Sequence, residues 1–285
     1  MPIDPEKALG ATFEPTQASY TRDQVILYHL GLGAGAPNQL DANELEYTYE
    51  KNLKVLPSFG VIPVFGAMGG AFNAPGLDFN PTMLLHGEQD IEIHRPIPTA
   101  ANLVNQSRIA GIYDKGKAAL LVMEVETKEE GGDPLFTNRF SLFLRGEGGF
   151  GGDSGPKAGN APPEREPDHV VETPTLPQQA LLYRLSGDKN PLHADPEFAK
   201  MGGFDVPILH GLCSFGINCK AAVDNALGGD TTKVARYQAR FAGVFFPGET
   251  MVTSLWKEGN TVFVNASSKE RGAPVITNAA LTLRD

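Results

Sequence analysis

The chain has 285 residues, 41% of them hydrophobic, which is enough for one large or two medium-sized domains with substantial cores. Its formal net charge of −10 argues against a nucleic-acid phosphate surface as a partner. The sequence contains no apolar run of the roughly 20 residues that a membrane span needs. We therefore expect a globular protein that does not bind nucleic acid and does not span a membrane.

The first half of the chain predicts antiparallel strands and little helix. Residues 118–127 are mostly apolar and then alternate, which is typical of a strand with one buried face. Residues 63–83 contain many Gly, Pro and Asn residues, so we expect no long rigid helix there. A sheet that lacks a full helix against it has room inside for a ligand.

A Gly- and Pro-rich stretch at residues 146–168 predicts a linker between two halves. We place an N-terminal domain at residues 1–150, the linker at 151–168 and a C-terminal domain at 169–285.

Two short segments of the first half have similar counterparts in the second half, which we call echoes. Residues 132–138 (GDPLFTN) are similar to residues 272–278 (GAPVITN), and Leu85-His86-Gly87 is similar to Leu209-His210-Gly211. Two echoes in the same order predict that the halves arose by duplication.

The second half predicts a long helix over residues 211–224, mostly apolar, which a sheet must wrap. Residues 261–267 alternate partly, as an antiparallel strand with one buried side does. Cys213 and Cys219 lie six positions apart on the expected helix, too far apart to bond. We interpret them as reduced core residues.

Residues 183–193, YRLSGDKNPLH, place a carboxylate and an imidazole on one tight turn. Asp188 and His193 are five positions apart, which is the wrong spacing for one helical face. Gly-Asp-x-Asn-Pro does not continue a helix, and a tight loop can turn both side chains toward one point. Alternatively, these residues form an ordinary turn, in which Asp188 bonds its own loop backbone and His193 begins the next helix. An Asp and a His that converge form an acid/base pair that can act on one water.

A second segment, PILHGLC at residues 207–213, follows at short range. Extended apolar residues end at His-Gly, where the helical pattern begins. Gly211 at the helix N-terminus offers a free backbone N–H and the positive end of the helix dipole. Such a group can hold a developing oxyanion.

Together the two segments resemble the signature of the MaoC-like (R)-specific 2-enoyl-CoA hydratases, the hydratase 2 family, also found as the hydratase part of peroxisomal multifunctional enzyme type 2. The resemblance implies an α+β double hot dog fold: two antiparallel sheets each curl around a helix, and the helix of the N-terminal half is reduced. It implies hydration of trans-2-enoyl-CoA to (3R)-hydroxyacyl-CoA, with medium to long chains, in fatty acid metabolism. Further blocks resemble the same family: residues 55–62, 85–89, 140–144, 148–152 and 256–260.

The resemblance also implies which other residues meet the substrate. Asn190 either holds one catalytic partner in place or caps the turn. His86 can instead be structural, Lys115 can be solvated or can meet a CoA phosphate, and Phe241 can pack the core or contact pantetheine. The residues implied along the acyl-CoA path are His86, Gly87, Lys115, Lys189, Pro191, Leu192 and Phe241.

We expect no cofactor, because CoA is part of the substrate, and no metal, because no metal-ligand spacing is present. A homodimer is expected. The final residues, LTLRD, do not form the Ser-Lys-Leu-type address of some eukaryotic relatives. This favours a bacterial cytoplasmic enzyme, whereas a eukaryotic member would be peroxisomal.

Three other functions are alternatives to enoyl-CoA hydration. A dehydratase for carrier-bound acyl chains would run the same chemistry backwards, but a carrier needs a basic docking patch and the net charge is negative. A hot dog thioesterase usually lacks the Gly-Asp-x-Asn-Pro-x-His turn. A non-catalytic acyl-CoA binding module would tolerate loss of Asp188 or His193, yet both are present.

Overall fold

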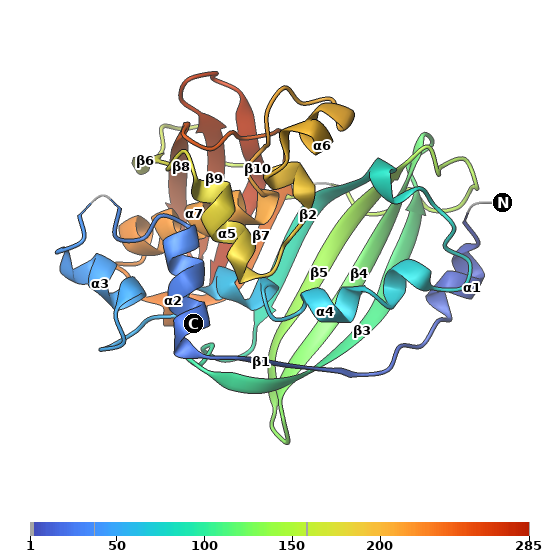
Figure 1. Cartoon of the computed structure of the whole chain (residues 1–285), viewed down its shortest axis with the longest axis horizontal. Helices are drawn as coiled ribbons and strands as arrows, with labels where there is room; N and C mark the ends of the chain where they lie inside the picture. Colours follow the sequence, from blue (N-terminus) through green and yellow to red (C-terminus); the bar gives the residue numbers. More distant parts are fainter. Residues whose placement is uncertain (1–2, 37, 158, 285) are drawn as a thin grey trace.

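The computed structural model describes residues 3–36, 38–157 and 159–284. The strands of this part of the chain form one antiparallel sheet of ten strands, in the order β1-β3-β4-β5-β2-β7-β10-β9-β8-β6 (Figure 1). The strands are β1 (Thr16–Tyr20), β2 (Leu84–Ile93), β3 (Ala101–Asp114), β4 (Ala118–Glu129), β5 (Pro134–Arg145), β6 (His169–Pro174), β7 (Val234–Phe241), β8 (Thr250–Glu258), β9 (Thr261–Ser268) and β10 (Pro274–Leu283).

This strand order reads the same from both ends, because each half contributes five strands with equivalent connections. The halves meet where β2 pairs with β7, with Glu88 opposite Arg240 and Glu92 opposite Arg236. Ion pairs cross the junction from Arg240 to Glu88 and from Arg236 to Asp90, the latter at 2.6 Å. The expected α+β double hot dog fold is confirmed, with its two sheets joined edge to edge into one.

The central helix of the second half is α7 (Gly211–Ala226), sixteen residues long. It contacts all five strands of its half, β6 to β10. Cys213 and Cys219 are buried on it as free thiols, as expected. A helix that is apolar on most faces requires such enclosure, because each exposed apolar face would remain in water.

The first half has short helical pieces in the corresponding place. They are η1 (Pro57–Val61), α4 (Phe65–Met68), η2 (Ala71–Asn73) and η3 (Pro81–Met83). Figure 1 shows α4 lying across the concave face of β3, β4 and β5. The prediction that this half lacks a long helix is confirmed. The cause is the Gly, Pro and Asn content of the segment, which makes helix propagation unfavourable.

Two helices pack against each other between the halves: α2 (Arg22–Gly31) from the first and α5 (Gln179–Tyr183) from the second. The rings of Tyr28 and Tyr183 lie 5.9 Å apart in this contact, and both are fully buried. The remaining helical segments are α1 (Pro5–Leu9), α3 (Ala42–Thr48), η4 (Arg184–Ser186), η5 (Pro191–His193), α6 (Pro196–Met201) and η6 (Thr231–Lys233).

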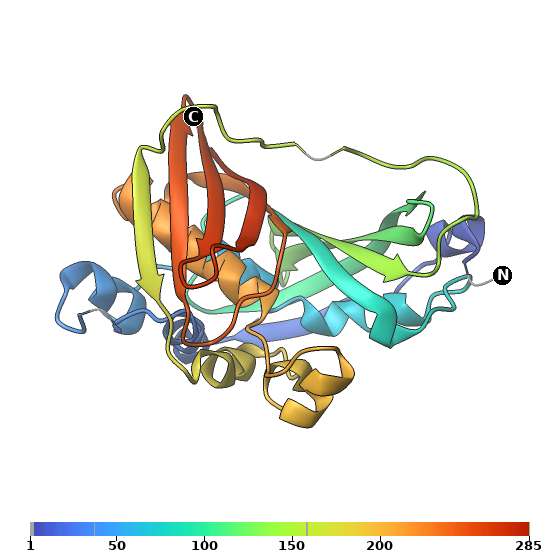
Figure 2. The same cartoon turned by 90° about the horizontal axis from the view of Figure 1, so that it is seen from above.

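Between residues 146 and 168, the described residues form neither helix nor strand. In Figure 2 this segment runs along the outside of the molecule from the first half to β6. Within the described residues, no helix is both long and apolar enough to cross a membrane.

One of the two echoes reflects the repeated fold and the other does not. Residues 132–138 and 272–278 open the equivalent strands β5 and β10, each after a hairpin. Leu85-His86-Gly87, however, lies within strand β2, whereas Leu209-His210-Gly211 leads into helix α7. The second echo is therefore a chance match, and the inference of duplication rests on the first.

Candidate active site

The loop after α5 folds as a chain of side-chain-capped turns. Gly187 has φ of +141°, which favours glycine, and this turns the chain out of η4. The Asp188 carboxylate accepts the Asn190 N–H at 3.1 Å, and the Asn190 side chain accepts the Leu192 N–H at 3.0 Å. Asn190 is thus the cap of η5. The turn-capping alternative describes its observed contacts.

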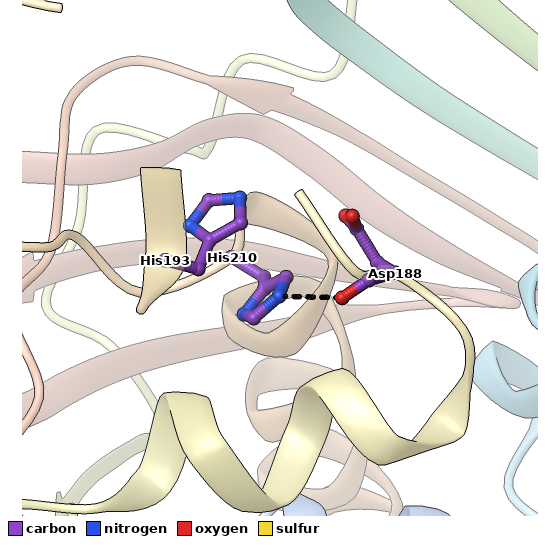
Figure 3. A group of neighbouring side chains, drawn as sticks. All are labelled: Asp188, His193 and His210. Carbon is purple, nitrogen blue, oxygen red and sulfur yellow. Dashed lines mark hydrogen bonds between the residues drawn. The ribbon is translucent and has the colours of Figure 1, made fainter. Parts of the chain in front are cut away.

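This loop brings the predicted acid/base pair together. Asp188 is half-buried and His193 is buried. Figure 3 shows the Asp188 carboxylate beside the His193 ring, with the His210 ring stacked against His193. One ligand-type atom from each of Asp188, His193 and His210 lies within 4.8 Å of the others.

A hydrogen bond fixes the tautomer of His193. Its Nδ1 lies 2.8 Å from the carbonyl oxygen of Ile208, which can only accept, so Nδ1 carries the proton. Nε2 is then unprotonated and available as a proton acceptor. Burial lowers the pKa of His193 below its ordinary value, against the raising effects of the Ile208 carbonyl and the Asp188 charge. The ring is therefore a neutral base at neutral pH.

Gly211 lies where the sequence places it, at the first position of α7. An N–H at this position has no partner inside the helix, and it lies at the positive end of the helix dipole. A Cβ built on Gly211 would lie 3.3 Å from the Phe241 ring, so only glycine leaves this wall uncrowded.

A cavity of about 630 Å³ joins the predicted residues to the first half. Asp188, His193 and Gly211 are among the residues that line it. Its lining from the first half is mostly apolar and comes from the segment that lacks a long helix and from strands β2 and β5. This apolar wall contains Phe65, Met68, Phe72, Leu84, Phe140 and Leu142.

The cavity is lined by three of the seven implied substrate residues. His86, Leu192 and Phe241 line it, as do Asn190 and the catalytic pair. The His86 ring contacts Phe140 and Phe241, with centroids 5.6 Å and 4.9 Å away.

The other four implied residues lie outside the cavity lining. Gly87 lies at a bulge in β2, where a Cβ would meet the Phe143 ring at 2.5 Å, so its role there is close packing. Lys115 lies in the turn between β3 and β4. Lys189 and Pro191 are exposed on the catalytic loop.

Sequence reasoning gave no role to His210 or to the apolar wall. The His-Gly pair at residues 210–211 predicts a role for Gly211 but none for His210. Phe65, Met68 and Phe72 are spaced three and four positions apart, a spacing typical of one helical face, although the structure places Phe65 and Met68 on α4 and Phe72 on η2. That spacing was a usable signal for the wall.

Asp188, His193 and His210 also have the composition of a metal site, but not its geometry. One nitrogen of each imidazole already faces a carbonyl oxygen. The rings are stacked, with centroids 3.7 Å apart and planes 28° apart, so their remaining lone pairs do not converge. We assign no metal to them.

Comparison with known proteins agrees with this geometry. A family model described as the MFE-2 hydratase 2 N-terminal domain matches residues 18–146, and a MaoC-like domain model matches residues 158–279. "Enoyl-CoA hydratase ChsH3" of Mycobacterium tuberculosis is 44% identical over 97% of each chain. "Enoyl-CoA hydratase 2, peroxisomal" of Arabidopsis thaliana is 44% identical over 92% of this chain and 89% of its own.

Among solved structures, a MaoC-like dehydratase from Phytophthora capsici has a TM-score of 0.88 at 32% identity, covering 99% of this chain and 98% of its own. A Mycobacterium tuberculosis protein described as having a double hotdog fold is similar in fold alone, with a TM-score of 0.56 at 12% identity, covering 96% of this chain and 97% of its own. Fold and site together define a hydro-lyase of the double hot dog class. The chain belongs to the MaoC-like hydratase 2 family.

Proposed function

We propose that this enzyme hydrates trans-2-enoyl-CoA esters of medium to long chain to (3R)-hydroxyacyl-CoA. The carrying observation is that Asp188, His193 and Gly211 line the same cavity as a set of apolar side chains from the first half. The apolar lining suits an acyl chain, and the polar residues suit the addition of water. Relatives at 44% identity are named as enoyl-CoA hydratases, which supports the same reaction here.

The reaction begins with one water between Asp188 and His193. Nε2 of neutral His193 takes a proton from this water as its oxygen bonds to C3 of the substrate. The π electrons move from C3 through C2 onto the thioester oxygen. The imidazolium then returns a proton to C2, and Asp188 stabilises that cation by its charge. Atoms and charge balance, and the steps reverse for dehydration.

Negative charge on the thioester oxygen is the costly feature of this path. The Gly211 N–H at the start of α7 is fixed before the reaction, so no reorganisation is needed to meet the charge. Losing one such donor costs roughly 10²–10³-fold in turnover in other enzymes.

The first half supplies the binding site for the fatty tail in this proposal. We accordingly propose that residues 1–150 form the tail-binding domain and residues 169–285 the catalytic domain, joined by the linker at 151–168. Each methylene buried against the apolar wall contributes about 0.8 kcal/mol. Longer enoyl chains should therefore bind better until the cavity is full.

The test is a hydration assay with crotonyl-CoA and trans-2-decenoyl-CoA. Loss of the enoyl absorbance reports hydration, and chromatography on a chiral phase reports the product. We expect turnover of both substrates and a (3R) product. A protein that binds both thioesters without turnover would instead be a non-catalytic module, and a (3S) product would refute the stereochemical part of the proposal.

One relative supports a second candidate. "3-Hydroxyacyl-thioester dehydratase Y" of Mycobacterium tuberculosis is 40% identical over 96% of this chain. The same site would then work in the direction of water loss. Comparing a CoA ester with the matching carrier-protein thioester decides between these two, because the net charge of −10 offers little attraction to an acidic carrier.

We also propose a homodimer located in a bacterial cytoplasm. The named relatives include both bacterial and peroxisomal proteins. Light scattering on the purified protein tests the dimer, and fractionation of the source cell tests the location.

A further inference from the structure

His210 is located where the three parts of the proposed site meet. Its ring is buried, with 1% of the residue exposed, and it stacks on His193 at a centroid distance of 3.7 Å. Its Nε2 lies 3.2 Å from the main-chain carbonyl oxygen of Asp188, the contact drawn in Figure 3. It is also the N-cap residue of α7, directly before Gly211.

The hydrogen bond settles the protonation of His210. A carbonyl oxygen only accepts, so Nε2 of His210 is the donor and carries a proton. Nδ1 is buried without a hydrogen-bond partner among the described residues, so the ring is neutral. Burial, together with the neighbouring His193, lowers the pKa of His210 to about 2. His210 is thus a fixed donor at every working pH and not a proton carrier.

The catalytic loop has few other anchors. Within the described part of the chain, the other hydrogen bonds of residues 187–191 stay within the loop or reach only its near neighbours, such as the Arg184 guanidinium to the Lys189 carbonyl. Among the described residues, two hydrogen bonds join the loop to the segment that leads into α7: one from His193 to the Ile208 carbonyl, and one from His210 to the carbonyl of Asp188 itself. The loop carries Asp188, and the start of α7 carries the oxyanion donor.

We propose that His210 is a positioning residue: its neutral ring holds the Asp188 main chain and the His193 ring in register, so that both address one water. This inference rests on the proposed hydration at this site. His210 does not itself touch substrate in the proposal. A displacement of about 1 Å in a catalytic group can cost on the order of 10²-fold in rate, so a positioning role has a large measurable effect.

Two variants separate the ring from the donor. His210→Phe keeps a ring against His193 and Tyr183 but has no donor for the Asp188 carbonyl. His210→Gln loses the stack but places an amide nitrogen near the position of Nε2, so it keeps a donor. The matched control is Tyr237→Phe, which removes one buried hydrogen bond to a carbonyl, that of Phe215, away from the cavity lining.

We expect His210→Phe to lower kcat for crotonyl-CoA by roughly 10- to 100-fold while KM changes less than about threefold. The acid limb of kcat/KM should also move. The groups facing the pair are Asp188, Arg184 and Tyr183, and the Asp188 charge raises the pKa of His193. When His210 no longer holds Asp188 in place, the Asp188 charge raises the pKa of His193 less, so the acid limb of kcat/KM should move to lower pH. His210→Gln should leave the acid limb at the pH of the parent. Tyr237→Phe should leave both the acid limb and kcat unchanged.

The outcomes are distinguishable. A parent enzyme that does not hydrate crotonyl-CoA refutes the proposed function. A parent that hydrates it, with His210→Phe matching the parent in kcat and pH profile, refutes the positioning role alone. An equal loss in both His210 variants with no shift of the limb also refutes it, because that pattern reflects destabilisation only. In an Asp188→Asn background, His210→Phe should add less than about a threefold further loss, whereas a full additional loss contradicts action through Asp188.

Discussion

The two halves of the molecule share a fold but differ in the loop after the first packed helix. Gln24, Leu27, Tyr28 and Leu30 on α2 recur at identical spacing as Gln179, Leu182, Tyr183 and Leu185. Continuing that alignment, Gly33 stands where the second half has Asp188, and Asn38 stands where it has His193. The first half therefore keeps the packed helix but neither the turn nor the predicted acid/base pair: Leu32, aligned with Gly187, has φ of −89°, against +141° for Gly187.

The halves also differ in their central helix, and this difference creates the cavity. α7 is long and buried in the second half, whereas η1 and α4 are short in the first. The cavity of about 630 Å³ opens beside α4. Beside η1, between the end of β2 and the start of β7, the structure has a smaller cavity of about 250 Å³. The space therefore lies in the half whose helices are short, next to the predicted acid/base pair of the other half.

The sharpest test of this division removes the acid/base pair. Asp188→Asn and His193→Ala should each lower hydration of crotonyl-CoA by roughly 10²–10⁴-fold. Because both act on one water, the double variant should be barely slower than either single variant. Steady-state assays measure the rates, and circular dichroism shows that the fold persists. Independent, multiplying losses would show that the two residues do not share a step.

A smaller effect is expected at the oxyanion donor. Gly211→Val places a Cβ 3.3 Å from the Phe241 ring and displaces the N–H, so turnover should fall roughly 10²–10³-fold. Binding of a non-reactive acyl-CoA, measured by calorimetry, should weaken as well. Near-normal turnover together with near-normal affinity would place the oxyanion site elsewhere.

The role of the first half is tested by filling the part of the cavity that it lines. Gly69 follows α4, lines the cavity and has no heavy atom closer than 3.9 Å to a built Cβ, so Gly69→Leu can project into the space. We expect decenoyl-CoA to lose at least tenfold in kcat/KM, because several methylenes at about 0.8 kcal/mol each lose their site, while crotonyl-CoA changes less than threefold.

Gly66→Leu is the matched control for this variant. Gly66 is also helical, lies outside the cavity lining and has open space around a built Cβ. It should leave both substrates unaffected. Equal losses of Gly69→Leu on the two substrates, or no chain-length preference in the parent enzyme, would remove the tail-binding role from the first half.

Much of the fold and the polar residues of the site could be predicted from sequence. The Gly-Asp-x-Asn-Pro-x-His turn and the His-Gly helix start are local, and local turn chemistry dictates their shape. The apolar stretch at 211–224 required a sheet around it. These features depend on neighbours in the sequence, so the residues alone carry them.

The contacts that were missed depend on residues far apart in the chain. The stack of His193 on His210 and the bond from His210 to the Asp188 carbonyl join two segments whose approach no local pattern encodes. The same holds for Lys115, whose turn lies away from the cavity lining although the family resemblance placed it on the substrate path. The echo at residues 85–87 misled because three matching residues say nothing about strand or helix.

His29 is a buried histidine of the first half, and its substitution is expected to have the smallest effect on activity. His29 on α2 directly follows Tyr28, as Arg184 follows Tyr183 in the second half. Its Nδ1 donates to the Tyr47 carbonyl at 2.9 Å, and its Nε2 accepts the Leu56 N–H at 3.3 Å. Both bonds need the neutral ring, and they tie α2 to α3 and to the segment before η1. We interpret His29 as structural.

Burial lowers the pKa of His29 to about 4, from an ordinary value of 6.5. Its stabilising contribution is present above pH 6.5 and is lost as the pH falls toward 4, because the unfolded chain then binds the extra proton. His29→Gln, which still donates and accepts but does not titrate, should flatten the fall of unfolding free energy in this window by up to about 1.4 kcal/mol per pH unit. Crotonyl-CoA turnover at neutral pH should stay within twofold of the parent, unlike that of His210→Phe. An unchanged pH slope in urea unfolding would mean that His29 does not titrate with folding. A large loss of turnover would mean that the first half takes part in the chemistry.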